Sequence, residues 1–400
     1  MRLIADLHIH SRFSRATSPR MDLPALARWA KIKGIGLLGT GDFTHPQWLK
    51  ELRDGLVPEG NGLYHHDDVR FMLTTEISAI WSQDGRVRKV HLLVLAPAIE
   101  VVERINRDLS LIGNLASDGR PILGISAQRL AEVVWNAEET AELIPAHVWT
   151  PWFSLFGSRS GFDSLEECFG PYTKRIFAIE TGLSSDPPMN WRLSALDHLT
   201  LISNSDAHSP SKLGREATLF DLPDPSYAGV IDAMKTRDPS RFLGTIEFHP
   251  QEGKYHYDGH RKCGIVLSPR EAIAHDNICP VCGKPLTIGV LHRVEDLADR
   301  DDGRAALVRP PFRSLVPLEE IISQALKVGV KTKTVSREYT HLIEEFRDEF
   351  RILLDLSQEE MEGRVPSRIL RGIMRVRSGD VQISPGYDGV YGQVRIPLDF

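Results

Sequence analysis

The sequence predicts an α/β fold, in which a β/α barrel is followed by a small cysteine-containing module and a mainly helical C-terminal region. Three observations predict it. Strand and helix patterns alternate up to residue 245, His, Asp or Glu recurs where strand patterns end, and three of the four cysteines gather after residue 245. A chain of 400 residues is too long for one core. We expect domains at residues 1–245, 246–310 and 311–400.

The composition is that of an ordinary soluble globular protein, with 42% hydrophobic and 26% charged residues. No apolar run approaches the roughly 20 residues needed to cross a membrane, and MRLIADLHIH leads into a strand pattern without an apolar signal region. We therefore expect a cytoplasmic protein with no membrane contact. Four cysteines in so long a chain make no disulfide framework. With a formal net charge of -6, any contact with nucleic acid must come from a local basic patch.

Strand and helix patterns follow one another along the barrel region. LIADLHI is an apolar run that fits a buried strand, and residues 22–34 have helical apolar spacing with Gly34 as a stop. The remaining strand patterns span residues 35–42, 69–78, 90–97, 142–148, 175–181, 198–208 and 241–248, and the remaining helix patterns span 46–56, 98–109 and 126–139. Strands separated by helices imply parallel strands with right-handed crossovers. Roughly seven such apolar units fit a closed barrel better than an open sheet.

Metal-ligating side chains stand at the ends of these strand patterns. They are His8, His10, Asp42, Glu76, His147, Asp206 and His208, with His91 at the start of its strand instead of the end. The carboxyl ends of barrel strands carry the chemistry, and strand residues two apart share a face. Imidazole with carboxylate suits zinc, manganese or iron. One strand-end histidine is more often an ordinary hydrogen-bonded residue, but eight such residues together predict two or three ions bridged by carboxylates. His45, in the loop beyond Asp42, is more weakly indicated.

Several motifs resemble those of the PHP (polymerase and histidinol phosphatase) superfamily, namely DLHIHSRFS, TGDFTH, TTEIS, the histidine of VHLLVL, PAHVW and SNSDAHS. The resemblance covers residues 1–245 and implies a phosphoesterase on a distorted seven-stranded β/α barrel, usually with three metal ions. The ligands that it implies are His8, His10, Glu76, His91, His147, Asp206 and His208. The family's second motif usually reads Thr-Asp-His, so in Thr40-Gly41-Asp42 we expect the aspartate to take the histidine's place. We expect Asp6 to orient a histidine, and we leave Glu180 open between ligand and support.

The region after the barrel carries a second metal motif. Cys279 and Cys282, in CPVCG, have the pattern of a zinc knuckle, in which a turn presents both sulfurs to one ion. Cys263 and His260 have the same spacing and are the expected upstream pair, which predicts one structural zinc ion. The alternatives for the fourth ligand are His256, His275 and His292. Cys168, in the helix-like SLEECFG, is expected in the core.

The C-terminal region combines helices with an arginine-rich segment. Residues 304–329 join a proline-broken stretch to a helix, and residues 336–356 have the spacing of an amphipathic helix. GRVPSRILRGIMRVR then carries five arginines, of which Arg368, Arg371 and Arg375 have helical spacing. Such a stripe is usually a solvated face, but in an acidic chain it also predicts a track for a phosphate backbone. The stretch ISPGYDGVYGQVRIP fits either a packed hairpin or a loop that touches a ligand.

Longer motifs over nearly the whole chain resemble the endonuclease Q family of archaea and some bacteria. They are DLHIHSRFSRATS, GTGDFTHPQW, IETGLSSDPPMNW, SDAHSPSKLGRE, CPVCGKPLTIGVLHRVEDLADR and SPGYDGVYG. The resemblance implies a DNA repair endonuclease that cuts double- or single-stranded DNA 5′ of deaminated bases (uracil, hypoxanthine, xanthine) and of abasic sites. Family analogy also suggests a replication clamp as a partner, although the final IPLDF shows no clear clamp-binding motif.

Two or three ions of Zn2+, Mn2+, Fe2+ or Mg2+ would activate a water for in-line attack and leave a 3′-hydroxyl and a 5′-phosphate. Reading one base in a duplex requires that base to leave the stack. Trp152 follows His147 closely, so we expect it either to stack on an extruded base or to pack on the barrel rim. Two other functions fit parts of the sequence, a small-molecule phosphatase of the histidinol phosphate type and a non-catalytic nucleic-acid-binding protein.

Overall fold

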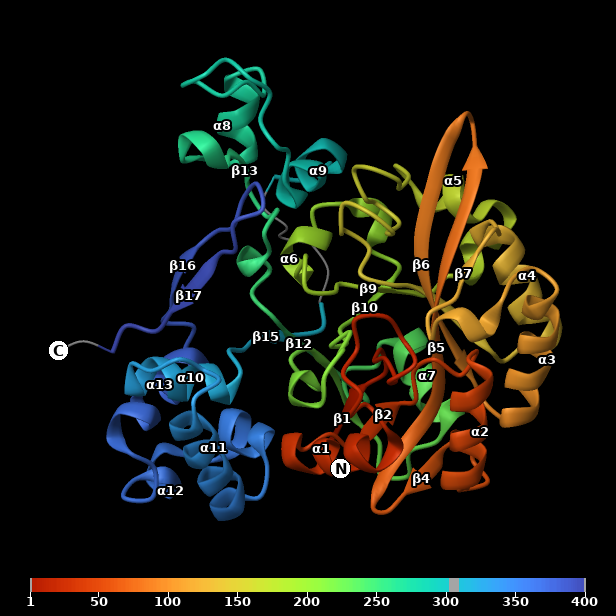
Figure 1. Ribbon diagram of the computed structural model, residues 1–400, viewed down its shortest axis with the longest axis horizontal. Helices are drawn as coiled ribbons and strands as arrows, with labels where there is room; N and C mark the ends of the chain where they lie inside the picture. The colour runs from red at the N-terminus through yellow and green to blue at the C-terminus, as the bar shows by residue number, and fades with distance from the viewer. Residues whose placement is uncertain (1, 302–308, 399–400) are drawn as a thin grey trace.

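The computed structural model describes residues 2–301 and 309–398. Figure 1 shows an α/β body, drawn from red to green, beside two smaller parts. One is a module that contains α8 (Pro269–Ala274) and α9 (Val290–Leu297), and the other is the helical C-terminal region. Within these residues, no helix combines the length and the apolar character that a membrane span requires.

The main sheet is mixed. Its strands are β1 (Arg2–Asp6), β2 (Leu37–Gly39), β3 (Val57–Pro58), β4 (Tyr64–His66), β5 (Val69–Gln83), β6 (Arg86–Ala96), β7 (Ile122–Leu123), β8 (Glu142–Pro145), β11 (Ala217–Asp221), β12 (Phe242–Glu247) and β15 (Phe312–Ser314). The path runs β15-β12-β11-β1-β2-β5-β4-β3, with β6 between β5 and β8 and β7 beside β5. β1, β2 and β5 pair in parallel, whereas β1–β11, β11–β12, β5–β6 and β6–β8 are antiparallel. The expectation of parallel strands was wrong for these four pairs.

The long hairpin β5–β6 is the clearest departure from the expected alternation. Asp84 and Gly85 join its strands with positive φ values of 52° and 72°, the conformation that a tight two-residue hairpin turn needs and that Asp-Gly readily adopts. No helix separates the two strands, so they pair antiparallel, with Ser78 opposite His91.

β9 (Ala178–Glu180) and β10 (Thr200–Ile202) pair in a separate two-stranded sheet. The closed seven-stranded barrel stays a prediction, because the hydrogen-bonded path of the main sheet is open.

Helices pack around the sheets and bury the core. They are α1 (Leu23–Lys33), α2 (Pro46–Gly55), α3 (Ile99–Ser110), α4 (Ala127–Ala137), α5 (Leu165–Phe169), α6 (Pro187–Asn190) and α7 (Tyr227–Thr236). α1 begins after Asp22, whose side chain accepts the N–H of Ala25, and ends at a left-handed Gly34, as the sequence predicts. Trp48 and Phe71 are fully buried. Cys168 is also fully buried, which confirms its expected place in the core.

The chain enters the small module after β12 of the main sheet and returns to this sheet at β15. The module contains the antiparallel pair β13 (Asp258–His260) and β14 (Ile265–Leu267) and a small core of Ala272, Cys279 and Leu286. β15 then pairs in parallel with β12, so the chain returns to the main sheet before it enters the C-terminal helices. Residues 302–308, at the start of the expected proline-broken stretch, lie outside the described residues.

The C-terminal region consists of α10 (Leu318–Leu326), α11 (Lys333–Phe346), α12 (Gln358–Met361), α13 (Ser367–Arg377) and the hairpin β16 (Gln382–Ser384)–β17 (Gln393–Arg395). The amphipathic helix expected over residues 336–356 is interrupted after Phe346, where Arg347 takes a positive φ of 87°, and a π-helical segment, Arg351–Asp355, follows. The glycine-rich turn of the hairpin packs on the small module. Gly386 donates its N–H to Gln251, and Gly389 donates to Lys254. The packed hairpin, one of the two interpretations of this stretch, is therefore the observed one.

Candidate metal centre

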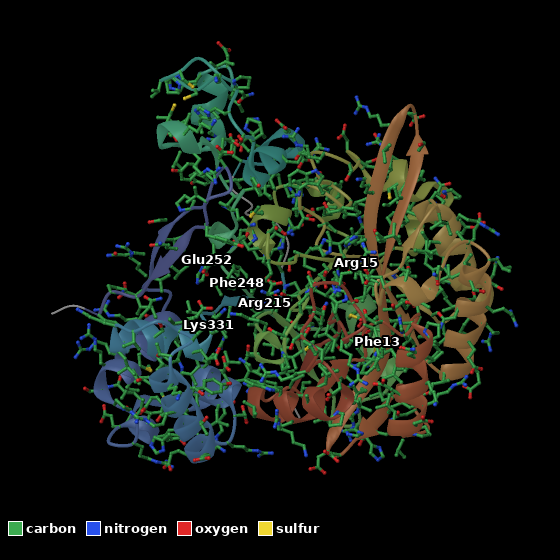
Figure 2. All side chains as sticks on the ribbon, in the orientation of Figure 1. Phe13, Arg15, Arg215, Phe248, Glu252 and Lys331 are labelled. Carbon is green, nitrogen blue, oxygen red and sulfur yellow. The ribbon has the colours of Figure 1, made fainter. Side chains whose placement is uncertain are left out.

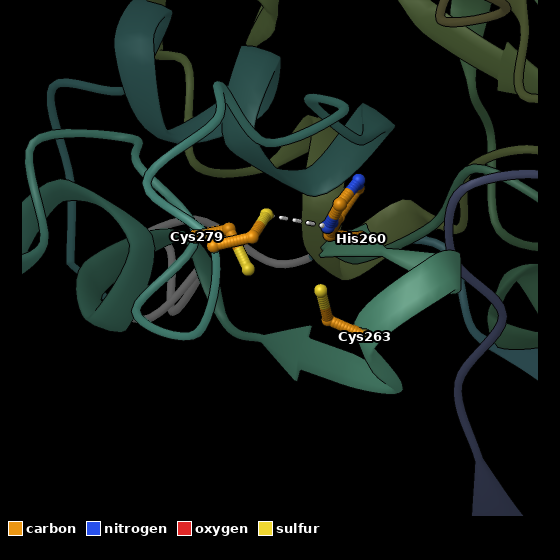
Figure 3. Close-up of side chains that lie close together, drawn as sticks. His260, Cys263 and Cys279 are labelled. Atoms are coloured by element: carbon orange, nitrogen blue, oxygen red, sulfur yellow. Dashed lines mark hydrogen bonds between the residues drawn. The ribbon is translucent and has the colours of Figure 1, made fainter.

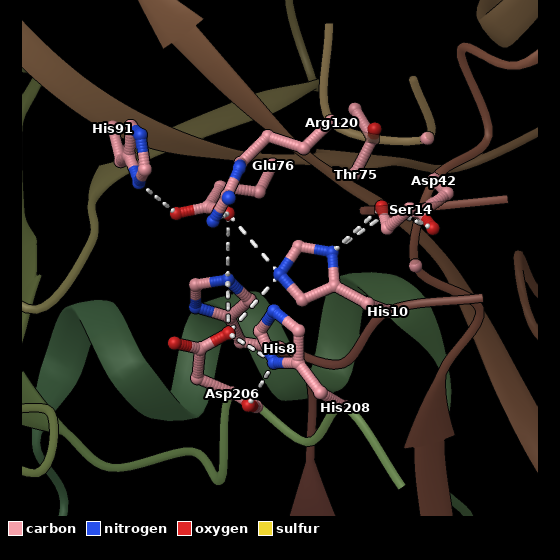
Figure 4. Close-up of polar contacts among 12 residues, drawn as sticks. His8, His10, Ser14, Asp42, Thr75, Glu76, His91, Arg120, Asp206 and His208 are labelled. Carbon is pink, nitrogen blue, oxygen red and sulfur yellow. Dashed lines mark hydrogen bonds and ion pairs between the residues drawn. The ribbon is translucent and has the colours of Figure 1, made fainter. Parts of the chain in front are cut away.

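The fold brings six of the eight predicted ligands together in two groups that share one carboxylate, and all six are buried except the half-buried Asp206 (Figure 4). Ligand atoms lie within 4.8 Å of one another in His8, His10, Glu76 and Asp206, and again in Glu76, His91 and His147. Glu76 Oε1 lies 2.6 Å from His91 Nδ1 and 2.9 Å from His147 Nε2. A carboxylate common to two groups of ligands can bridge two metal ions.

Three atoms of the first group show that these residues fit a metal. Nε2 of His8, Nε2 of His10 and Oδ1 of Asp206 are buried and form no hydrogen bond with any described residue. His10 Nε2 lies 3.0 Å from Asp206 Oδ1 and 3.2 Å from Glu76 Oε2, yet these contacts lack hydrogen-bond alignment. Buried polar atoms without partners are costly in a folded protein. Imidazole nitrogens and carboxylate oxygens that converge in this way fit divalent cations.

A carboxylate holds the second nitrogen of both N-terminal histidines. His8 Nδ1 lies 3.0 and 2.9 Å from the two oxygens of Glu180, and His10 Nδ1 lies 3.0 Å from Asp42 Oδ1. Glu180 also accepts the backbone N–H of His147 at 2.8 Å. Such a carboxylate fixes the tautomer and the orientation of a ligating imidazole. Glu180, which the sequence left open, therefore has the contacts of a supporting residue.

Asp42 lies behind His10, outside both groups of ligand atoms. Its Oδ2 accepts the N–H and the hydroxyl of Ser11 at 2.6 and 2.7 Å, and Ser14 donates to the same oxygen at 2.9 Å. With both oxygens occupied, Asp42 has the contacts of a support for His10, and its role as a metal ligand stays a prediction. His208 also lies outside the groups, with its ring 4.5 Å from that of His10.

Asp6 and His45 also lie outside both groups of ligand atoms. Asp6 accepts the N–H groups of Ser205 and Gly214 at 3.0 and 2.9 Å. It therefore holds the loop that carries Asp206, and these contacts replace the expected contact with a histidine ring. His45 lies outside both ligand groups, and its ring stacks on that of Phe13 at 4.4 Å.

Burial and charge set the protonation of the centre. Burial lowers the pKa of His91 to about 4. Burial would also lower the pKa of His8, His10 and His147, but the neighbouring carboxylates raise it above its ordinary value. Burial would raise the pKa of Glu76, but His91 and Arg120 help to hold it well below its ordinary value. The backbone is left-handed at His147 and Asp206, with φ values of 31° and 46°. Non-glycine residues in this region are strained, and such strain concentrates at functional sites.

Arg120 lies beside this centre, and Trp152 lies on the segment that follows His147. Arg120 Nη1 donates to Glu76 Oε2 at 3.0 Å, and no motif of the sequence marks this arginine. Trp152 is 45% exposed and meets the ring of Tyr255 edge-on at 6.0 Å. Trp149, from the same segment, is buried and donates to Asn190 at 2.8 Å. The segment therefore packs the core through Trp149 and presents Trp152 at the surface.

The small module contains a third group, formed by His260, Cys263, Cys279 and Cys282, whose ligand atoms lie within 4.8 Å of one another. Figure 3 shows the cysteine side chains around the ring of His260. Burial would raise the pKa of the Cys279 thiol, but the backbone N–H groups of Cys282 and Val281 lower it to about 6. A turn that stabilises thiolate in this way fits a tetrahedral zinc ion.

The alternative fourth ligands of the module lie in other contacts. His292 Nδ1 lies 2.5 Å from Asp258 Oδ2, and the ring of His256 stacks with that of Tyr257. His275 follows the last residue of α8 and is its C-cap. His260 is therefore the histidine that the fold places beside the three cysteines.

The predicted arginine stripe lies on α13, whose apolar face is buried. Arg371 is exposed, whereas Arg368 and Arg375 are half-buried. Arg375 forms an ion pair with Asp380, just beyond the helix. Arg368, Lys327 and others line a surface cavity of about 640 Å³. DNA binding by this stripe stays a prediction.

Comparisons with known proteins extend these observations. The family model described as PHP-associated matches residues 191–239, and that of the MJ0043 C-terminal domain matches residues 317–380. The uncharacterized protein YqxK of Bacillus subtilis is 28% identical over 415 residues, covering 98% of this chain and 99% of that protein. The uncharacterized protein MJ0043 of Methanocaldococcus jannaschii is 33% identical over 253 residues, covering 62% of this chain and 31% of that protein.

Two solved structures match almost the whole chain. The lesion-specific endonuclease PfuEndoQ from Pyrococcus furiosus has a TM-score of 0.89 and 34% identity, over 99% of this chain and 96% of that one. A complex of endonuclease Q with a 27-mer duplex substrate, with an abasic lesion at the active site, has a TM-score of 0.86 and 34% identity, over 99% and 97%. The fold and the buried ligand groups define a metal-dependent phosphoesterase of the PHP type. The similarity to both structures is more specific, and it shows that the chain belongs to the endonuclease Q family. It is a metal-dependent hydrolase of the nuclease class.

Proposed function

We propose that this protein is a DNA repair endonuclease that hydrolyses the phosphodiester on the 5′ side of deaminated bases (uracil, hypoxanthine, xanthine) and of abasic sites. The observation that carries the proposal is the 34% identity, over 99% of the chain, to endonuclease Q in complex with a lesion-containing duplex. The buried atoms of His8, His10 and Asp206 that lack partners support the hydrolytic part, because they fit divalent ions.

Two or three ions, of Zn2+, Mn2+, Fe2+ or Mg2+, would be held by His8, His10, Glu76, His91, His147, Asp206 and His208, with Asp42 as the further predicted ligand. When bound, such ions polarise a phosphoryl oxygen and lower the pKa of water. The contribution of the protein itself is to orient the side chains that would hold the ions. Glu180 and Asp42 lock the rings of His8 and His10. Hydrolysis would leave a 3′-hydroxyl and a 5′-phosphate.

Other surfaces of the chain support DNA as the substrate. Trp152 is exposed on the segment that follows His147, and an exposed aromatic ring can stack on a base that has left the duplex. Arg368, Arg371 and Arg375 would contact the phosphate backbone away from the cut. One zinc ion at His260, Cys263, Cys279 and Cys282 would stabilise the module. The seven-stranded PHP barrel, a replication clamp as partner and a cytoplasmic location belong to the same proposal.

The experiment is incision of end-labelled DNA with a single uracil, hypoxanthine, xanthine or abasic site. Undamaged duplex and added EDTA are the controls. We expect a metal-dependent cut immediately 5′ of the lesion, and we expect His8→Ala and Asp206→Ala to abolish it without loss of helical circular dichroism. Full activity of either variant would overturn the assignment of the centre. Hydrolysis of a chromogenic phosphate monoester, without cutting of any DNA, would replace the proposal with the phosphatase alternative.

A further inference from the structure

Arg120 is a positive charge inside a centre of histidines and carboxylates. It lies in the connection between α3 and β7, and its side chain is only 26% exposed. Figure 4 shows its guanidinium directed at Glu76, to which Nη1 donates at 3.0 Å. A cation beside a metal-binding carboxylate competes with the metal, so neutralising Glu76 is a poor explanation for an arginine here. A guanidinium has five N–H donors in a planar fork that matches phosphate.

The loop that carries Arg120 is fixed against the centre. The N–H of Gly119 donates to the Phe13 carbonyl at 3.0 Å, and the Pro121 carbonyl accepts the Ser78 N–H at 3.0 Å. A Cβ added to Gly119 would lie 2.3 Å from Asp42 Oδ2, so only glycine allows the loop to approach this closely. Backbone hydrogen bonds at Gly119 and Pro121, on either side of Arg120, therefore fix the position of Arg120 beside the metal ligands.

A second arginine is tied to the same loop through Asp118. Asp118 Oδ1 accepts the backbone N–H of both Arg120 and Arg15, each at 3.2 Å. Asp118 Oδ2 lies 3.2 Å from Arg15 Nε, and the Arg15 side chain is 74% exposed. Figure 2 shows Arg15 near Phe13 on the α/β body. One buried carboxylate thus organises an inner arginine, beside the metal ligands, and an outer arginine at the surface.

We propose that Arg120 and Arg15 bind two neighbouring phosphates of the strand that is cut. Arg120 binds the non-bridging oxygens of the scissile phosphate, and Arg15 binds an adjacent phosphate outside the metal centre. Because Asp118 occupies only one edge of the Arg15 guanidinium, the remaining donors face solvent and can reach an anion. This inference rests on the proposed function, since it takes the substrate to be a nucleic-acid strand.

Single-turnover incision of an abasic duplex tests the inner arginine. We expect Arg120→Ala to lower the rate roughly 100- to 1,000-fold, as the loss of a fixed charge at a transition state does. Arg120→Lys should regain only part of this rate, because an ammonium cannot bind bidentately. Metal content, measured by mass spectrometry, should stay at the wild-type level. A rate within twofold of wild type, or a loss of ions that accounts for the lost rate, would refute the role of Arg120.

The outer arginine is tested by binding. We expect Arg15→Ala to raise the Kd for DNA and to reduce the slope of log K against log salt by about one, as the loss of one phosphate contact does. A methylphosphonate at the adjacent phosphate should weaken the wild type but should add nothing to Arg15→Ala. Arg129→Ala, which removes an exposed arginine paired with Glu132 on α4, is the matched control and should bind normally. If Arg15→Ala and the methylphosphonate each weaken DNA binding and their effects add, Arg15 does not bind that phosphate.

If the protein does not cut DNA, the role of Arg120 can still be tested on a small phosphodiester. If the metal-loaded wild type cuts no DNA, hydrolysis of bis(p-nitrophenyl) phosphate reports on the centre alone. A large loss with Arg120→Ala on this small diester would keep Arg120 as a phosphate ligand while the DNA substrate is withdrawn. Normal hydrolysis of the diester by Arg120→Ala would remove the arginine from the site as well.

Discussion

Lys33, the last residue of α1, and Glu349, after α11, form a buried ion pair across 316 residues of chain. Lys33 Nζ lies 2.5 Å from Glu349 Oε2, and the two side chains are 4% and 5% exposed. The same carboxylate accepts the Tyr339 hydroxyl at 2.6 Å and the Leu318 N–H at 3.0 Å. The pair therefore joins the α/β body to the centre of the C-terminal region.

Replacing Lys33 with Ala should destabilise the protein by about 3–5 kcal/mol, because it leaves the Glu349 charge buried without a partner. Urea unfolding at pH 7, followed by fluorescence, measures the change. Lys31→Ala is the matched control, since Lys31 pairs at the surface with Asp68 and its loss should cost less than about 1 kcal/mol. If both variants lower the free energy of unfolding by the same amount, the buried pair contributes no more to stability than the surface pair.

The same pair predicts acid sensitivity. Burial would raise the pKa of Glu349, but Lys33 and the hydrogen bond from Tyr339 hold it below its ordinary value. A carboxylate whose folded pKa is depressed adds stability above its unfolded pKa and loses it as the pH falls through the folded pKa. The free energy of unfolding of the wild type should therefore fall more steeply below about pH 4.5 than that of Glu349→Gln. Parallel pH profiles of the two proteins would contradict this prediction.

The small module should hold zinc independently of the catalytic centre. Cys279→Ser removes a ligand atom whose thiolate the fold stabilises, so we expect the loss of one zinc ion per chain and faster proteolysis within residues 253–299. His8→Ala should show the reverse pattern, retaining this zinc and losing ions from the other groups. Elemental analysis of both purified variants separates the two sites. Unchanged zinc in Cys279→Ser would refute the module's site.

The convergence of the candidate ligands was predictable where it depends on residues that are close in the sequence. His8 and His10 lie two residues apart just after β1, and their ring centroids are 5.6 Å apart. His91 looked misplaced because it begins its strand. In the structure β6 begins earlier, at Arg86, so His91 lies in the middle of β6 and faces Ser78 in the middle of the antiparallel strand β5. The Asp84-Gly85 pair was the signal that could have revealed this hairpin.

The rest of the site depends on contacts that no short motif encodes. Arg120 reaches Glu76 from a loop 44 residues further along the chain. Asp6 bonds to Ser205 across 199 residues, so its role could not be inferred from its neighbours in the sequence. Asp42 resembles a ligand in sequence because it replaces the family's histidine, but its contacts with Ser11 and His10 depend on how two strands lie side by side.

Trp152 should control the choice between damaged and undamaged DNA. Its ring is 45% exposed and meets that of Tyr255, from the segment between β12 and β13, at 6.0 Å. Stacking on a base contributes about 1–3 kcal/mol, and Trp152→Ala should therefore lower the rate on lesion-containing duplex roughly 10- to 100-fold. The metal content should not change, and Trp152→Phe should restore part of the rate. Trp29→Ala, a half-buried tryptophan on α1, controls for the general loss of an indole. If Trp152→Ala keeps the wild-type preference for the lesion, Trp152 serves only to pack the rim.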